Sequence, residues 1–379
     1  MNHTFQTPFQ SPTNERVVGR QIALFAAFVL PAAKLLEAPS ILAKYAAGDL
    51  LLPALLHFLL QAGLLAVILY VVSRSETPLF ERLQRVLKKG VIVVYLFYAA
   101  YFLFAVLLPI LDLEKYAYAA FFDTAPTTFS FLFFFFLSAF ICAKGIKAVG
   151  RFADISLFLF LLSFFALMAL SLTETDFTHL LPLFGTKFER TMSAFKYTTP
   201  HFSDAVLLLP LLGNYQYKKK DAPKILFGYG IGALCTLFFL AVFYGIFSSV
   251  APREHYAFSK IAQYFPALSV IGRIDLLFVY LLSIVLFFYT ALPAQYATHL
   301  FSRSFSLERK AIVSAVLNVA LFLFVFFCNK YYNAFYRVVG GKLVWVFWLF
   351  ADVLPLLLLL LPNGKPRPAA PSAKEKSHA

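Results

Sequence analysis

Long apolar stretches separated by short polar segments run along most of this sequence. A membrane-spanning helix needs about 20 mostly apolar residues, and ten segments between residues 17 and 361 meet this requirement. The predicted spans are Val17–Ala47, Leu50–Ser73, Gly90–Ile110, Pro126–Ala143, Phe152–Leu172, Thr199–Tyr215, Ile225–Val250, Ile274–Leu300, Ala311–Asn329 and Leu343–Leu361. The pattern predicts an all-α polytopic membrane protein with ten transmembrane helices, flanked by polar ends at residues 1–16 and 362–379.

Proline and charge interrupt the first span. Pro31 and Pro39 disfavour an unbroken helix there, because proline lacks an N–H and clashes with the preceding turn. Lys34 and Glu37 lie between them, and a charge in the bilayer costs about 2.5–3.5 kcal/mol unless it is paired or lines a cavity. Spaced three residues apart, Lys34 and Glu37 can pair on one helical face.

The sixth span is interrupted in the same way. Pro200 and Pro210 bracket the polar residues His201, Ser203 and Asp204. Non-helical backbone at membrane depth persists only where protein or a wet cavity satisfies its polar groups. Interrupted spans at corresponding positions of two halves indicate a transporter binding site.

The two interrupted spans divide the membrane domain into halves of similar length. Residues 17–172 and residues 199–361 each contain five predicted spans, and each half begins with an interrupted one. Because five is an odd number, the second half must cross the membrane in the opposite sense to the first. The pattern therefore predicts two inverted five-helix repeats with broken helices 1 and 6.

The charged residues predict the orientation of the chain. Most of the 33 Lys and Arg residues fall on one side if both ends are cytoplasmic, as the positive-inside rule requires. Phe80–Lys89 on that side is a basic amphipathic segment, which we expect on the inner membrane surface. On the other side, Ala257, Ile261 and Tyr264 share helical spacing within Glu254–Leu268. This segment either covers the outer mouth or rests on lipid headgroups.

Composition supports the membrane assignment and excludes other classes of protein. Of 379 residues, 61% are hydrophobic and 14% are charged, whereas soluble domains have about 45–50% and 25%. These values exclude a soluble enzyme, a disordered chain and a disulfide scaffold. The net charge of +14 is explained by topology rather than by nucleic acid. The three cysteines are far apart in the sequence and do not have the spacing of metal ligands. The sequence also contains no catalytic or cofactor-binding motif, so we expect no enzyme activity, cofactor or metal.

A few further polar residues are candidates for function. Asp352 is an isolated acid in the last span, and His57 in the second span is better explained as an interhelical histidine than as a proton relay. Tyr95, Tyr98 and Tyr101 could line a cavity or form a packing face. Asp112, Glu114 and Asp123 are assigned to an acidic outer loop after the third span.

Several segments resemble one family of membrane proteins. They are RVVGRQIALFAAFVL in the first span, GDLLLPALL around Asp49, FDTAPTTF and KGIKAVGRFADIS around the fourth and fifth spans, and ALSVIGRIDLLFVYLLS before the eighth. The chain resembles the B-subunit family of bacterial spore germinant receptors, the spore permease branch of the amino acid–polyamine–organocation transporter superfamily. The resemblance covers about residues 17–361.

The resemblance implies a LeuT-like fold, a midplane pocket and specific partners. The partners are an A-type membrane subunit and a C-type lipoprotein subunit in the spore inner membrane, and the ligand is a small nutrient such as an amino acid. By position, the pocket would contain Ala32, Ala33, Lys34 and Glu37 on helix 1, Phe202, Ser203, Asp204 and Leu207 on helix 6, Tyr98 and Tyr101 on helix 3, and Phe278 on helix 8.

Three functions are compatible with this pattern. The first is a permease-like receptor subunit that binds a nutrient at the helix 1/6 break and signals to its partners. The second is an H⁺- or Na⁺-coupled amino acid transporter, in which Glu37, Asp204 or Asp352 carries the proton or helps to bind the ion. The third is a conduit for ions or water that is lined by the broken helices.

Overall fold

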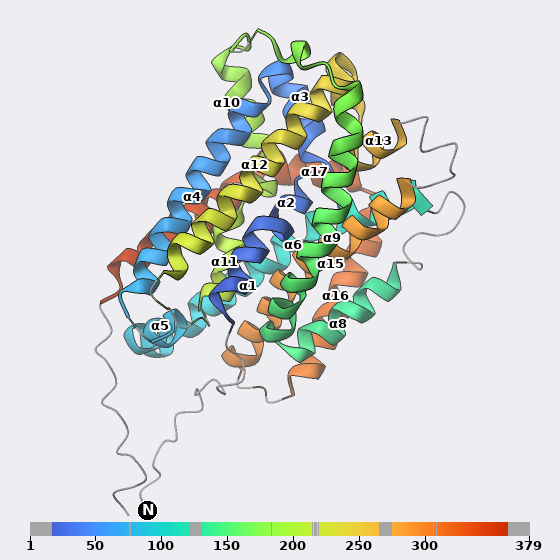
Figure 1. The fold of residues 1–379 in the computed structure, drawn as a ribbon. Helices are drawn as coiled ribbons and strands as arrows, with labels where there is room; N and C mark the ends of the chain where they lie inside the picture. Colours follow the sequence, from blue (N-terminus) through green and yellow to red (C-terminus); the bar gives the residue numbers. More distant parts are fainter. Residues whose placement is uncertain are drawn as a thin grey trace, which may run out of the picture.

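Six long apolar helices form the body of the protein in the computed structural model (Figure 1). The structure describes residues 17–75, 77–121, 131–182, 184–213, 215, 218, 220–264, 275–305, 307 and 309–362. The six are α4 (Leu51–Ser73), α6 (Val91–Phe121), α9 (Ile146–Ser171), α12 (Asp221–Phe247), α15 (Asp275–Ser304) and α16 (Lys310–Asn329). No strand occurs in the described residues, so the prediction of an all-α membrane protein is confirmed.

Two further spans are bent pairs of helical segments. The first joins α1 (Gly19–Leu24), a π-helical turn at Phe25–Val29 and α2 (Leu30–Ala33) to α3 (Ala38–Ala46), with a bend of 63°. The second joins α17 (Tyr332–Arg337) and a π-turn at Val338–Lys342 to α18 (Val344–Phe347) and the turns Trp348–Val353 and Leu354–Leu360, with a bend of 56°. The predicted break in the first span is thus confirmed.

Shorter helices take the positions of the remaining two predicted spans. They are α8 (Leu132–Lys144) and the pair α10 (Phe188–Thr198) and α11 (Asp204–Gly213). By length and hydropathy the described residues contain up to eight spans, so the count of ten stays a prediction. Residues 1–16, 122–130, 265–274 and 363–379, which include Asp123 and parts of the predicted segments, lie outside the described residues.

Both ends of the described chain lie on the same side of the bundle (Figure 1). At the start of α1, Arg20 pairs with Asp154 near the start of α9 at 3.0 Å. At the other end, buried Arg82 of α5 (Leu79–Leu87) donates hydrogen bonds to the carbonyl oxygens of Val71 and Pro362. The position of both ends on one side agrees with an even number of membrane crossings. The Arg82 hydrogen bonds hold the predicted amphipathic segment against the ends of two spans.

One sequence-based boundary was wrong because charged residues lie inside a helix. Asp112 and Glu114, assigned to an outer loop, belong to α6 and are buried. The Tyr332 hydroxyl donates to Asp112 at 2.6 Å and the Asn329 amide to Glu114 at 3.0 Å. Local hydropathy cannot find partners that are more than 200 residues away.

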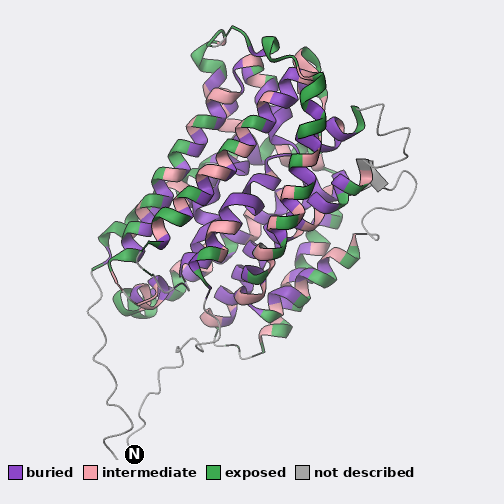
Figure 2. Ribbon diagram, viewed as in Figure 1, coloured by how far each residue is buried: buried purple, intermediate pink, exposed green. Residues whose placement is uncertain are grey.

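Burial separates a central group of segments from the surrounding helices (Figure 2). Every residue of α11 is buried, whereas the outer face of α8 exposes Phe133 and Phe136 at 66% and 73%. In a membrane protein, exposed apolar side chains of this kind lie on the lipid-facing or partner-facing surface. Phe133 and Phe136 therefore mark the outward face of α8.

Two glycines of α12 bring that helix into contact with helix 1. A Cβ on Gly228 would lie 2.6 Å from the Ala23 carbonyl oxygen, and a Cβ on Gly232 would lie 2.7 Å from Pro31 Cγ. Only glycine allows this approach, as in other close membrane-helix contacts. The contact fixes helix 1 just before its break.

Candidate functional site

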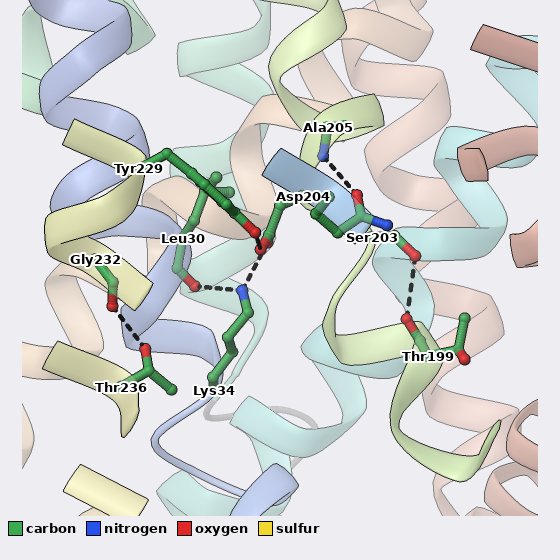
Figure 3. A network of polar contacts seen from close by, with 10 residues as sticks. Leu30, Lys34, Thr199, Ser203, Asp204, Ala205, Tyr229, Gly232 and Thr236 are labelled. Atoms are coloured by element: carbon green, nitrogen blue, oxygen red, sulfur yellow. Dashed lines mark hydrogen bonds and ion pairs between the residues drawn. The ribbon is translucent and has the colours of Figure 1, made fainter. Parts of the chain in front are cut away.

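The two helix breaks face each other in the centre of the bundle (Figure 3). Residues 34–37 separate α2 from α3, and Phe202 and Ser203 separate a 3₁₀ turn at Thr199–His201 from α11. Proline at each break explains why the helix does not continue: Pro31 and Pro39 flank the first, and Pro200 precedes the second. The structure thus brings together the interrupted segments that the sequence singled out.

A buried ion pair joins the two breaks. Lys34 Nζ donates to Asp204 Oδ1 at 2.6 Å and to the Leu30 carbonyl oxygen at 3.1 Å (Figure 3). Both side chains are 1% exposed. A buried charge without a partner costs several kcal/mol, so each of these residues holds the other in place.

Asp204 has a second partner from α12. The Tyr229 hydroxyl donates to Asp204 Oδ2 at 2.8 Å, so both carboxylate oxygens are engaged. Asp204 is also the first residue of α11, where a helix N-terminus favours negative charge. These contacts fix the position of the carboxylate at the break.

A glutamine extends this network to the last span. Gln61 of α4 accepts a hydrogen bond from the Ala205 backbone N–H at 3.0 Å and donates to Asp352 Oδ1 at 2.8 Å. Asp352 is therefore not the isolated acid that the sequence indicated. Gln61 connects the N-terminus of α11 to Asp352.

Aromatic rings cover the ion pair on one side. The Phe202 ring stacks on His57 with centroids 4.6 Å apart, and Lys34 Nζ lies 5.3 Å from the Phe202 centroid. His57 Nε2 contacts the Phe195 carbonyl oxygen and the Thr198 hydroxyl on α10. The interpretation of His57 as an interhelical histidine agrees with these contacts.

Glu37 pairs with a different residue from the one predicted. Its carboxylate lies 2.9 Å from His255 Nδ1, and Lys34 instead binds Asp204. The expected Lys34–Glu37 pair was wrong because residues 34–37 are not helical, so spacing of three does not place them on one face. The Glu37 hydrogen bond raises the pKa of His255 above its usual value, more than partial burial lowers it.

The short helix α13 (Ala257–Tyr264) closes this side of the break. The backbone N–H groups of Ala257 and Phe258 donate to the carbonyl oxygens of Leu36 and Leu35, at 3.1 and 3.0 Å. These carbonyls have no helical partner because the helix stops. Of the two interpretations of this segment, the structure favours a cover over the break.

A small polar cavity lies beside the breaks. Its volume is about 20 Å³, which holds about one water molecule. It is lined by Ala33 and Leu36 of helix 1, His201, Asp112 of α6, and Tyr289 and Thr290 of α15, among others. Tyr289 and Thr290 were not among the predicted site residues, and Asp112 was predicted to lie in a loop. The only available signal for Asp112 was a charge directly after an apolar run.

The other predicted site residues lie partly at the breaks and partly away from them. Ala32, Phe202, Ser203 and Leu207 are buried at or next to the breaks. Tyr101 lies near Ser203 and stacks on Phe350. Tyr98 lines a separate, larger cavity. Phe278 precedes Tyr289 by eleven residues, about 16 Å along the helix, and is not part of the small cavity.

The described residues contain no cluster of three or more His, Cys, Asp or Glu side chains placed to hold a metal ion. The polar groups at the breaks are the Lys34–Asp204 and Glu37–His255 pairs, the Tyr229 hydroxyl and the Gln61 amide.

Comparisons with known proteins complete this description. The sequence profile of a family described as "Spore germination protein" (Spore_permease) matches residues 21–332. Comparison with curated protein sequences finds no match. Among solved structures, the inward-facing conformation of Mhp1 is similar at 13% identity, covering 90% of this chain and 76% of that chain, with a TM-score of 0.37.

Proposed function

The chain belongs to the spore germination protein family of permeases, and we propose that it senses a small nutrient, an amino acid, at the helix 1/6 break. It is a multi-pass membrane protein with a permease-like architecture. In the proposed role it is one subunit of a germinant receptor in the spore inner membrane. Its partners there are an A-type membrane subunit and a C-type lipoprotein subunit, and both of its ends are cytoplasmic.

The observation that supports this proposal is the Lys34–Asp204 pair across the two breaks. A free amino acid carries one ammonium and one carboxylate group. Inserted between Lys34 and Asp204, its ammonium takes the place of Nζ on Asp204 while its carboxylate accepts from Nζ. Every charge keeps a partner in this exchange, which avoids the cost of an unpaired buried charge.

Ligand insertion requires the two breaks to separate. The present cavity of about 20 Å³ is too small for an amino acid. A ligand that binds the separated arrangement more tightly shifts the population toward it. Because helix 1 also bonds to α13 and α11 bonds to α4 through Gln61, the movement is passed to α13 and α4. We propose that partner subunits detect this movement.

A germination assay with matched variants tests the proposal. Spores that carry Asp204→Asn should lose the response to an amino acid mixture, measured as the fall in light scattering, while immunoblots show normal membrane levels. The control Asp154→Asn, in the exposed pair with Arg20, should respond normally. A normal response of Asp204→Asn would remove Asp204 from the site.

Reconstitution separates this function from the two alternatives. The purified chain in proteoliposomes should bind amino acid without accumulating it. Concentrative uptake driven by an H⁺ or Na⁺ gradient would instead establish a secondary transporter. Steady single-channel conductance of the chain alone would establish an ion conduit.

A further inference from the structure

A large cavity lies away from the helix breaks. Its volume is about 480 Å³, within the range of small-molecule sites. It is bounded by α5 through Leu83 and Val86, by α6 through Val94 and Tyr98, and by Leu300 of α15 and Leu357 near the chain end. It therefore lies beneath the amphipathic helix, at the end of the bundle where that helix rests.

The chemistry of this cavity excludes a polar nutrient. All its lining side chains are aliphatic or aromatic, and their polar atoms are three tyrosine hydroxyls, on Tyr95, Tyr98 and Tyr296. A charged amino acid placed there would lose its hydration without gaining ion pairs. The cavity suits a hydrocarbon chain.

The cavity also borders the surface that faces the bilayer. Two lining residues, Phe97 on α6 and Leu360 at the chain end, are 59% and 79% exposed. Val86 and Leu87 on α5 are exposed as well. Apolar side chains this exposed face lipid tails in a membrane protein, so an acyl chain can enter from the bilayer between α5 and α6.

Positive charge marks the polar end of the same cavity. Arg85, Lys88 and Lys89 are exposed at the end of α5 and in the turn that follows, directly beside the lining residues Val86 and Leu87. None of the three forms an ion pair within the described part of the chain. α5 itself carries a single acid, Glu81. Such a cluster of positive charges near a membrane surface attracts an anionic lipid headgroup.

The chain's own tail does not fit this cavity. The sequence after Pro362 is NGKPRPAAPSAKEKSHA, which is polar and basic. Such a segment has no hydrocarbon for the cavity and is repelled by Arg85, Lys88 and Lys89. An anionic lipid matches both parts of the surface.

We propose that this cavity binds one anionic phospholipid. One acyl chain occupies the space between α5, α6 and α15, and the phosphate group lies against Arg85, Lys88 and Lys89. The lipid holds α5 on the bundle together with the Arg82 hydrogen bonds. This site is independent of the nutrient site, since it shares no lining residue with the small cavity at the breaks.

Native mass spectrometry of the purified full-length chain tests the proposal. With equal amounts of dioleoyl phosphatidylglycerol and dioleoyl phosphatidylcholine, the protein should retain one phosphatidylglycerol with a preference of about tenfold or more. The variant R85Q/K88Q/K89Q should lose this preference. The variant K144Q/K147Q/R151Q removes the same number of Lys and Arg charges at the α8–α9 junction and should keep it.

Further experiments locate the acyl chain and show whether the bound phosphate belongs to a lipid or is free. Val94→Trp fills the cavity without changing charge and should abolish the tightly bound lipid, and Leu300→Trp repeats the test from α15 if the first variant does not fold. Dihexanoyl phosphatidylglycerol and inorganic phosphate should both fail to displace the long-chain lipid. Retention of the lipid by a folded cavity-filling variant, displacement by phosphate, or an equal loss in the control triple variant would each overturn the proposal.

Discussion

Lys34 and Asp204 are 170 positions apart in the sequence, and their charged atoms lie 2.6 Å apart in the structure. Each comes from a helix interrupted by proline, and each is buried. The pair therefore depends on both breaks having the right geometry at once. A change in the geometry of either break is therefore expected to alter the distance between Lys34 Nζ and the Asp204 carboxylate.

Neutralising one member of this pair should destabilise the protein more than neutralising both. Lys34→Met leaves the Asp204 carboxylate buried with only Tyr229 as a partner, and breaking a buried pair costs about 3–5 kcal/mol. The double variant Lys34→Met/Asp204→Leu removes both charges and should recover most of this loss. Thermal unfolding in detergent, followed by intrinsic fluorescence, measures the difference.

An exposed ion pair provides the control for that comparison. Arg20 and Asp154 have side-chain exposures of 74% and 35%, and such pairs contribute about 0–1 kcal/mol. Arg20→Met should therefore leave the unfolding temperature almost unchanged. Equal destabilisation by the single and double variants at Lys34 and Asp204 would mean that side-chain volume, not charge pairing, matters at the break.

Sequence patterns predicted the apolar helices well and their polar contacts poorly. The predicted span Leu50–Ser73 matches α4 to within one residue, because its hydropathy is continuous. The proline-interrupted segments also proved to be breaks. The residues that meet there were less predictable: Lys34 was expected to pair with Glu37, three residues away, yet its partner comes from the other half of the chain.

The errors share a physical cause. Asp112 was assigned to a loop because a charge in an apolar helix is costly, but the Tyr332 hydroxyl bonds to it. The family resemblance placed Tyr98 in the nutrient pocket by its position on helix 3, and in the structure Tyr98 lines the larger cavity beside α5. Partners and helix rotation are set by tertiary packing, which a single-sequence pattern does not encode.

Removing one hydroxyl at the network should have a smaller effect than removing a charge. Tyr229→Phe deletes the donor to Asp204 Oδ2 and leaves a buried carboxylate oxygen unsatisfied, at a cost of about 1–3 kcal/mol. The unfolding temperature should fall less than in Lys34→Met. Tyr280→Phe, at a side chain 59% exposed on α15, is the matched control. If both phenylalanine variants have the same unfolding temperature, the Tyr229 hydrogen bond makes no net contribution to stability.

The cover over helix 1 should weaken as pH rises. The Glu37 hydrogen bond raises the pKa of His255 above 6.5. Its stabilising contribution is therefore complete below the unfolded-state pKa, about 6.5, and is lost as pH rises through the higher folded-state value. Glu254, Lys44 and Lys260 also surround this group and modify its midpoint. Hydrogen exchange of the α13 amides, corrected for intrinsic rates, should show less protection at pH 9 than at pH 6.

A histidine variant isolates this effect from other titrations. His255→Gln cannot gain a proton, so protection of the Ala257 and Phe258 amides, which bond to the helix 1 carbonyls, should no longer change between these pH values. The difference between wild type and variant gives the contribution of the His255–Glu37 pair. If both proteins show the same pH dependence, the pair does not hold α13 against the break.

Two glycines on α12 should respond in opposite directions to the same substitution. A Cβ on Gly232 would lie 2.7 Å from Pro31 Cγ and 2.8 Å from the Ala26 carbonyl oxygen, whereas a Cβ on Gly230 meets nothing within 4 Å. Alanine favours a helix over glycine by about 1 kcal/mol, so Gly230→Ala should stabilise the protein or leave it unchanged. Gly232→Ala must push helix 1 away, at an overpacking cost of about 1–3 kcal/mol.

The position of Gly232 makes its variant a test of the nutrient site as well as of packing. Pro31 lies three residues before Lys34, so a displaced helix 1 moves Nζ away from Asp204. Gly232→Ala should therefore unfold at a lower temperature and respond more weakly to amino acids in the germination assay, while Gly230→Ala keeps both properties. A normal nutrient response in Gly232→Ala, with the expected loss of stability, would show that signalling does not depend on the close packing of helix 1 against α12.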